Sequence, residues 1–189
     1  MATPGGRSPK DAADRARARA SRLRDLSPVM KVMAEDWATE TSDAFRNERS
    51  PAGDPWPELA PSTLKKRAAK LPGAKRRSKK TGKLTKAARN KRKAGLVAGS
   101  GLIRMLVDNG LLRNATSYRV GPSGQSVNIQ GVEYLEPHVT GSIVRKGHPP
   151  KRNPLVIDRD AMGYMALIPR AHKKLTEAIS HYVATGKVS

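Results

Sequence analysis

The densest chemistry in this sequence is a run of positive charge. Residues 65–93 hold 15 of the 37 lysines and arginines and contain neither an acidic nor an aromatic residue. Such a segment can neutralise the phosphates of a nucleic acid without reading its sequence, or it can dock on an acidic protein surface. The lack of aromatic side chains disfavours stacking on single-stranded bases. The candidate contacts to DNA or to an acidic partner are Lys75, Arg76, Arg77, Lys79, Lys80, Lys83, Lys86, Arg89, Lys91, Arg92 and Lys93.

The other reactive residue types form no recognisable active site. The histidines at 138, 148, 172 and 181 have no metal-ligand spacing to one another or to a carboxylate, and there is no cysteine. The Gly-Ser-Gly at residues 99–101 lacks the Gly-x-Ser-x-Gly spacing of a nucleophile elbow. The sequence therefore predicts no catalytic residues, no metal and no cofactor. His172 lies on the apolar stripe of a predicted helix, where we expect a packing role.

The composition predicts a small core with appendages. Hydrophobic residues make up 37% of the chain and aromatic residues 4%, so part of the fold is expected to be completed by partners. Outside residues 65–93, 22 basic residues face 16 acidic ones, so most of the net charge of +21 is local. The apolar runs are too short to span a bilayer, and no apolar stretch of a signal peptide follows the N-terminus. The default expectation is a cytoplasmic, soluble protein.

Helical patterns dominate the first third of the chain. Residues 1–8 are expected to be disordered, and residues 9–69 to hold helices and a proline-rich loop. Ser27 and Pro28 predict the start of a fresh helix that runs to about Asn47, and a kink at Pro28 within one longer helix is the alternative. The apolar residues that this helix should bury are Met30, Met33, Trp37 and Phe45.

Four prolines between residues 51 and 61 forbid a continuous helix and define a loop. Gly53 and Asp54 supply a tight turn within it. Trp56 and Leu59 are its only large apolar side chains, so we expect them to attach the loop to the domain. A short helix should follow over residues 62–69.

The remainder predicts a basic insertion and then an α+β part. Residues 70–95 show no periodic apolar face and are interpreted as a loop extruded from the domain. Within residues 96–184, strands at 117–121 and 125–130 should form a hairpin, followed by a short helix at 132–141. Residues 158–168 fit a helix, which we favour. The alternative is a strand at residues 164–168 that pairs back on residues 155–157. A helix from Pro169 should carry one apolar face, made of Ile168, His172, Leu175, Ile179 and Tyr182.

Four segments follow one another along the chain. The first is a phenylalanine that ends a helix, Phe45, followed at residues 50–66 by Ser-Pro-Ala-Gly-Asp-Pro-Trp-Pro-Glu-Leu-Ala-Pro-Ser-Thr-Leu-Lys-Lys. The second is Met-Leu-Val-Asp-Asn-Gly-Leu-Leu-Arg-Asn-Ala at 105–115, the third is Tyr134-Leu-Glu-Pro-His138 with Gly141, and the fourth is Pro-Lys-Arg-Asn-Pro-Leu at 150–155. In this order they resemble the phage virion morphogenesis (tail completion) family typified by phage Mu, with Asn109 where the family has threonine. The basic insertion at residues 70–95 departs from this pattern, and the arginine-rich N-terminal helix is interpreted as a further addition.

The resemblance implies a non-enzymatic structural subunit of the phage neck: a tail terminator, tail-completion or head–tail joining protein in the virion. It implies a homomeric ring, with a hexamer as the expected size, that contacts neighbouring neck and tail-tube proteins and passing double-stranded DNA. Assembly in the host cytoplasm and no membrane contact follow from it. The expected structural anchors are Phe45, Trp56, Leu59, Leu106 and Tyr134. The alternative function is a sequence-independent, basic nucleic-acid-binding protein.

Overall fold

The computed structural model describes residues 8–97, 111–131, 135–140, 151–159, 162 and 165–188. The chain has two compact units. The first unit comprises Met1–Glu40, Ser117–Gln130 and Val156–Ser189, and the second comprises Thr41–Thr116 and Gly131–Leu155. Helices and two small antiparallel strand pairs within the described ranges make this an α+β protein, as predicted.

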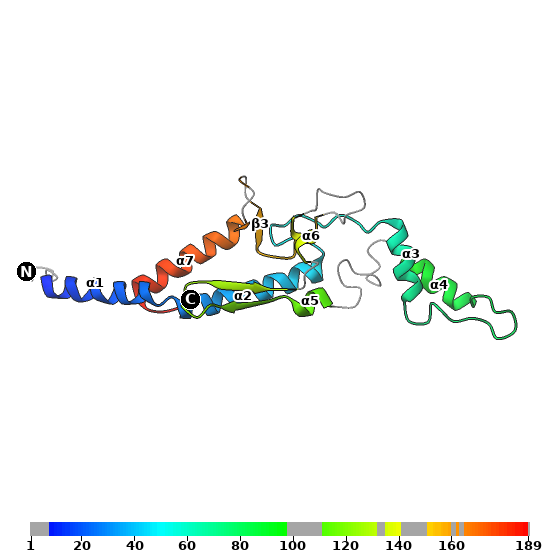
Figure 1. Cartoon of the computed structure of the whole chain (residues 1–189), viewed down its shortest axis with the longest axis horizontal. Helices are drawn as coiled ribbons and strands as arrows, with labels where there is room; N and C mark the ends of the chain where they lie inside the picture. The colour runs from blue at the N-terminus through cyan, green and yellow to red at the C-terminus, as the bar shows by residue number, and fades with distance from the viewer. Residues whose placement is uncertain are drawn as a thin grey trace, which may run out of the picture. The chain divides into compact units, whose positions relative to one another are not determined.

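Helix α1 (Pro9–Arg24) opens the first unit (Figure 1). A capping box starts it, because the Ser8 hydroxyl accepts from the Asp11 N–H and the Asp11 carboxylate accepts from the Ser8 N–H, both at 3.2 Å. No residue of α1 is buried. Near its end the Arg22 guanidinium donates to the Val183 carbonyl at 2.9 Å, which attaches α1 to the last turn of helix α7 (Pro169–Thr185).

Helix α2 (Ser27–Asn47) is a separate helix, so the predicted fresh start is confirmed and the single kinked helix is wrong. Asp25 breaks the path because its backbone is extended (φ −125°, ψ 95°). Its carboxylate then accepts the Ser27 N–H at 3.0 Å and satisfies one of the open donors of the new helix. The predicted buried residues Met30, Met33, Trp37 and Phe45 are all buried.

The core of the first unit lies between α2 and α7. Its buried members are Val29, Met33, Trp37, Val156, Ile168 and Ala171. Strands β1 (Ser117–Val120) and β2 (Val127–Gln130) pair antiparallel with Tyr118 opposite Ile129, which confirms the predicted hairpin. Tyr118 packs edge-on against Trp37 with ring centroids 6.2 Å apart, so the hairpin covers α2.

The favoured helix over residues 158–168 is wrong. Strands β3 (Ile157–Arg159) and β4 (Met165–Leu167) pair antiparallel, with Ile157 opposite Leu167. The Ile168 N–H donates to the Val156 carbonyl at 2.9 Å and continues the ladder. The reason is Pro169, because a residue that precedes proline is driven out of the helical region, and Ile168 is extended (φ −58°, ψ 149°).

Helix α7 begins at Pro169, as predicted, and its apolar face matches the predicted one except that Ala171 takes the place of His172. Ala171 is fully buried and Leu175, Ala178, Ile179 and Tyr182 pack against the core, whereas His172 is exposed. The packing role expected for His172 is therefore wrong. A small alanine occupies the innermost position because α7 approaches the core closely there, and a search for large apolar residues passes over it.

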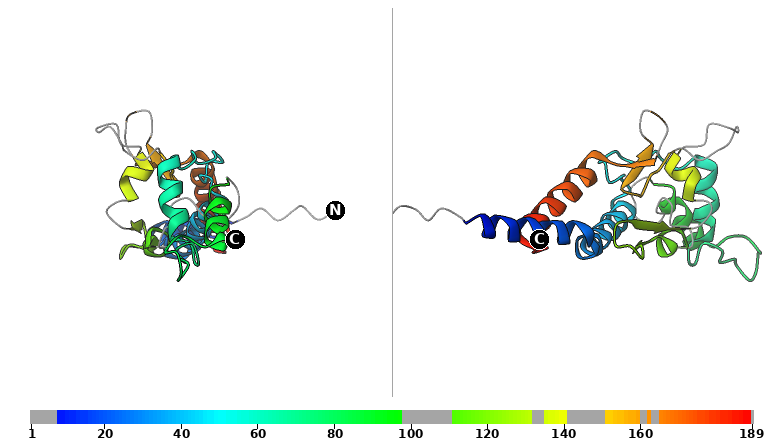
Figure 2. Two further views of the ribbon diagram at one scale, coloured as in Figure 1. Left: turned by 90° about the vertical axis from the view of Figure 1, so that its right-hand side faces the viewer. Right: turned by 60° about the vertical axis from the view of Figure 1, so that its left-hand side comes forward.

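The second unit contains α3 (Pro61–Lys70), α4 (Lys86–Gly95), α5 (Leu111–Ala115) and α6 (Leu135–Thr140). Helices α3 and α4 pack together, and Figure 2 shows them side by side. The unstructured loop predicted for residues 70–95 is thus wrong over α4, which Thr85 caps by accepting the Ala88 N–H at 3.2 Å. Three alanines of this region, Ala68 in α3, Ala88 in α4 and Ala74 between the two helices, are at most 2% exposed. Alanine lets the two helices approach without large apolar residues, which is why periodicity does not detect it.

Some expectations fall outside the described residues. They are the disorder of residues 1–7, the anchors Leu106 and Tyr134, the Leu-Val-Asp-Asn-Gly turn, His148 and Tyr164.

Candidate functional site: a tryptophan corner and a basic hairpin

The proline-rich loop forms a folded corner, which we call the tryptophan corner (residues 48–59). Just after α2, Glu48 adopts a left-handed backbone (φ 54°) that turns the chain. Arg49 then pairs with Pro55 across a short antiparallel bridge, closed by Gly53 at φ 106°. The Trp56 N–H donates to the Glu48 carbonyl at 2.9 Å. These contacts return the tryptophan to the end of α2.

Trp56 is buried in the second unit. Its ring meets Phe45 edge-on, with centroids 5.8 Å apart and planes at 81°. Its indole Nε1 donates to the Asn153 carbonyl at 3.3 Å, so the polar end of the ring is also satisfied. Leu59 is half-buried. The structure therefore joins two of the resembling segments, the corner and residues 150–155, at one place.

Arg152 is the residue of this site that the sequence did not single out. It is 4% exposed, and its guanidinium donates to the carbonyls of Pro57 (Nε) and Glu58 (Nη2), each at 2.8 Å. Burial lowers the pKa of Arg152, and the nearby charge of Arg67 lowers it further. Phe45 precedes the tryptophan corner in the sequence and Arg152 follows it, so residues from both sides of the chain contact the corner. Its position between two prolines, in a run similar to a family element, was the available signal.

His138 lies beside this arginine. The Arg152 N–H donates to the His138 carbonyl at 2.8 Å, and the His138 Nδ1 is buried without a hydrogen-bond partner among the residues that the structure describes. Burial lowers the pKa of His138, and the charges of Arg152 and Arg67 act in the same direction. These effects favour the neutral form of the imidazole in the folded protein.

A stability change with pH follows from His138. Because its folded pKa lies below that of the unfolded chain, the stabilisation is complete above pH 6.5 and is lost as the pH falls through the lowered folded value. We expect the urea midpoint of the native protein to fall between pH 7.5 and 5.5. His138→Gln should flatten this part of the profile, while His181→Gln, at an exposed position, should leave it unchanged. An equal slope in native protein and His138→Gln would contradict the assignment.

The basic hairpin, defined as residues 61–95, presents most of its cations to solvent. Of the eleven candidate contacts, all but Arg92 are exposed. Arg92 is half-buried, and its Nε donates to the Ala74 carbonyl at 2.9 Å. Arg77 donates to the Gly82 carbonyl at 2.8 Å and closes the connecting loop, whose strands meet at the Arg77–Leu84 bridge. These two arginines therefore hold the hairpin itself.

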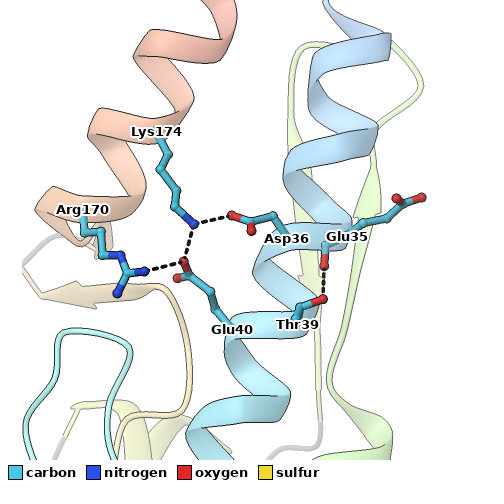
Figure 3. A network of polar contacts seen from close by, with 6 residues as sticks. All are labelled: Glu35, Asp36, Thr39, Glu40, Arg170 and Lys174. Atoms are coloured by element: carbon cyan, nitrogen blue, oxygen red, sulfur yellow. Dashed lines mark hydrogen bonds and ion pairs between the residues drawn. The ribbon is translucent and has the colours of Figure 1, made fainter. Parts of the chain in front are cut away.

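A separate ionic network joins α2 and α7 in the first unit (Figure 3). The Lys174 ammonium lies 2.7 Å from a Glu40 carboxylate oxygen and 3.0 Å from one of Asp36, and Arg170 reaches the same Glu40 oxygen at 4.0 Å. Hydrogen bonds to Glu40 and then Asp36 raise the pKa of Lys174. Glu40 is 15% exposed at its side chain, so it depends on these cations.

Removing Lys174 should weaken the α2–α7 contact. Lys174→Met leaves the Glu40 carboxylate with only the longer Arg170 contact, and we expect a loss of about 1 kcal/mol, kept small because the lysine is partly solvated. Lys173→Met, one residue away in solvent, is the matched control and should change the free energy of unfolding by less than about 0.5 kcal/mol. Chemical denaturation at pH 7 measures both. Equal effects would show that the network does not stabilise the contact.

No group of histidine, aspartate and glutamate side chains suited to holding a metal occurs in the described ranges. Among those same residues, no helix is long and apolar enough to cross a membrane.

A known protein family matches the part of the chain that contains the tryptophan corner and the helices before it. Residues 8–101 match the model of the phage virion morphogenesis family. Over these residues, about half of its length, the chain belongs to that family, and the predicted resemblance is confirmed. Its role lies in phage virion morphogenesis, as a virion-associated protein. The matched range includes α1 and the basic hairpin. No curated protein and no solved structure matches the chain significantly.

Proposed function

We propose that this protein is a non-enzymatic structural subunit of the phage head–tail junction, acting in tail termination, tail completion or head–tail joining. It works as a homomeric ring, with a hexamer as the expected size. The observation that carries the proposal is the family match over residues 8–101, joined with the tryptophan corner inside that range. Neighbouring neck and tail-tube proteins are the proposed partners.

Helix α1 supports an assembled state. It has 16 residues, none of them buried, and Leu23 near its end is 52% exposed. A helix of about this length is marginal in water unless something packs against it. Within the described residues, its contacts with α7 attach it to the protomer, including the Arg22 hydrogen bond. A neighbouring subunit that covers α1 would supply the missing burial.

The test is the mass of the purified chain by size exclusion with light scattering at 0.5 M NaCl, which suppresses charge-driven aggregation. A discrete oligomer, visible as a ring by negative-stain microscopy, is expected. Leu23→Asp should dissociate it while leaving the protomer folded, whereas Val97→Asp, another exposed apolar position, is the matched control. If the protein stays monomeric both alone and after mixing with isolated tails, the proposed ring is wrong.

One observation favours a second function. The cation excess of residues 65–93 would suit a sequence-independent nucleic-acid-binding protein that acts as a monomer. Such a protein would need no neck or tail partner, and imaging of whole particles would show no copy of it at the neck.

A further inference from the structure

The basic hairpin points to a function other than ring assembly. Its cations are held in place by secondary structure and are not scattered along a coil. In α4, Lys86, Arg89 and Lys93 follow one another at spacings of three and four residues and are all exposed. They therefore share one side of the helix, away from buried Ala88, over about 10 Å of its length. In α3, Lys66 is likewise exposed and lies opposite buried Ala68.

The surface chemistry of the hairpin selects between a nucleic acid and an acidic protein. A specific protein interface has an apolar centre enriched in aromatic residues, with charges at its rim. The hairpin contains no aromatic residue, and its leucines Leu64, Leu71 and Leu84 are half-buried. What remains exposed is cationic or small, with no large apolar side chain among the exposed residues of the hairpin. Phosphate groups need only such cations, since counterion release supplies the affinity.

The same set of exposed side chains favours double-stranded over single-stranded nucleic acid. Binding to single strands gains much of its affinity from bases stacked on aromatic side chains, which this surface lacks. A duplex presents two rows of phosphates at high charge density and needs no stacking. A preformed row of cations on α4 also loses less conformational freedom on binding than a disordered basic tail would.

We propose that the basic hairpin is a preformed, sequence-independent binding surface for the backbone of double-stranded DNA, with Lys86, Arg89 and Lys93 of α4 as its central contacts. Arg77 and Arg92 are excluded from the contact set because their guanidinium groups already donate to the carbonyls of Gly82 and Ala74. The surface lies within one unit and does not depend on how subunits assemble.

The experiment measures affinity of the full-length protein for a fluorescent 20-base-pair duplex by anisotropy between 50 and 300 mM NaCl. The variant Lys86→Gln/Arg89→Gln/Lys93→Gln keeps helix propensity and removes three charges. We expect it to bind at least about tenfold more weakly at 100 mM NaCl and to lower the slope of log K against log salt by about 0.9 per lost contact. The matched control is Arg15→Gln/Arg17→Gln/Arg19→Gln, which removes three exposed charges from α1 in the first unit. It should bind within about threefold of the native protein.

Each outcome decides the proposal. Circular dichroism must show that both triple variants keep the native helix content. The variant Lys86→Arg/Lys93→Arg retains all three charges and should bind the duplex with native affinity. Equal losses in the two triple variants would show diffuse charge attraction and overturn the assigned surface. Tighter binding to a single strand of the same length than to the duplex would also overturn it. If polyglutamate competes for the protein as well as unlabelled duplex does at matched charge concentration, the surface binds an acidic protein instead. Ring formation is read separately by light scattering, so either idea can fail without the other.

Discussion

Replacing Trp56 by alanine is expected to lower the free energy of unfolding of the second unit by about 3–5 kcal/mol, the usual cost of emptying a buried aromatic site. The indole is 5% exposed, stacks edge-on against Phe45 and donates to the Asn153 carbonyl. Its loss would leave a cavity beside Phe45 and remove the indole hydrogen bond to the Asn153 carbonyl. A change of this size is a large part of the stability of a small domain.

The chain offers a convenient internal reporter for this experiment. It has two tryptophans, and the other, Trp37, lies in the core of the first unit. In Trp56→Ala, the remaining fluorescence therefore follows the first unit, while far-ultraviolet circular dichroism follows both. We expect the two urea transitions to separate. Trp56→Phe keeps a ring against Phe45 and should lose much less, so equal losses in the two variants would show that the ring contact is unimportant.

Arg152→Met is expected to destabilise the second unit by about 3 kcal/mol. Two charge-assisted hydrogen bonds disappear, and the carbonyls of Pro57 and Glu58 are left without that donor. Methionine fills a similar volume, so the loss reports hydrogen bonding more than packing. Lys151→Met, at the exposed neighbouring position, should change the free energy of unfolding by less than about 0.5 kcal/mol. Urea denaturation at pH 7 measures both.

Further variants separate a structural arginine from a merely adjacent charge. Arg152→Lys should recover only part of the loss, because one ammonium cannot reproduce the planar guanidinium that spans two carbonyls. The double variant Trp56→Ala/Arg152→Met should cost less than the sum of its parts, since both residues close the same corner. Removing the Arg152 charge should also raise the pKa of His138 and weaken the pH dependence of stability. Strict additivity would show that the corner is not one cooperative element.

The local elements were predictable because their signals are local. The Ser27–Pro28 start, the alternating strands around Pro122–Gly124 and the proline start of α7 each follow from backbone chemistry within a few residues. The two large aromatic residues of the corner could also be predicted as buried, because exposed Phe and Trp are costly in a chain so poor in apolar residues.

Other features depended on partners distant in the sequence. Helix α4 packs on α3 and buries Ala88, and alanine carries too little hydrophobicity to reveal such packing from a pattern. The β3–β4 pairing comes from Pro169 acting on Ile168 together with a cross-strand partner, which outweighed the helical tendency of the segment.

By itself the sequence determined two chemical features of this protein: a cation-rich segment free of acids and a proline-bounded tryptophan. Only the tertiary structure decided what each charge does. It buries Arg152 against two carbonyls, engages Arg77 and Arg92 with carbonyls of the hairpin itself and leaves Lys86, Arg89 and Lys93 in solvent without such a bond to any residue that the structure describes. The physical reason is that a basic side chain is read as a surface charge until the carbonyls that accept its hydrogen bonds are known, and those lie as many as 95 residues away.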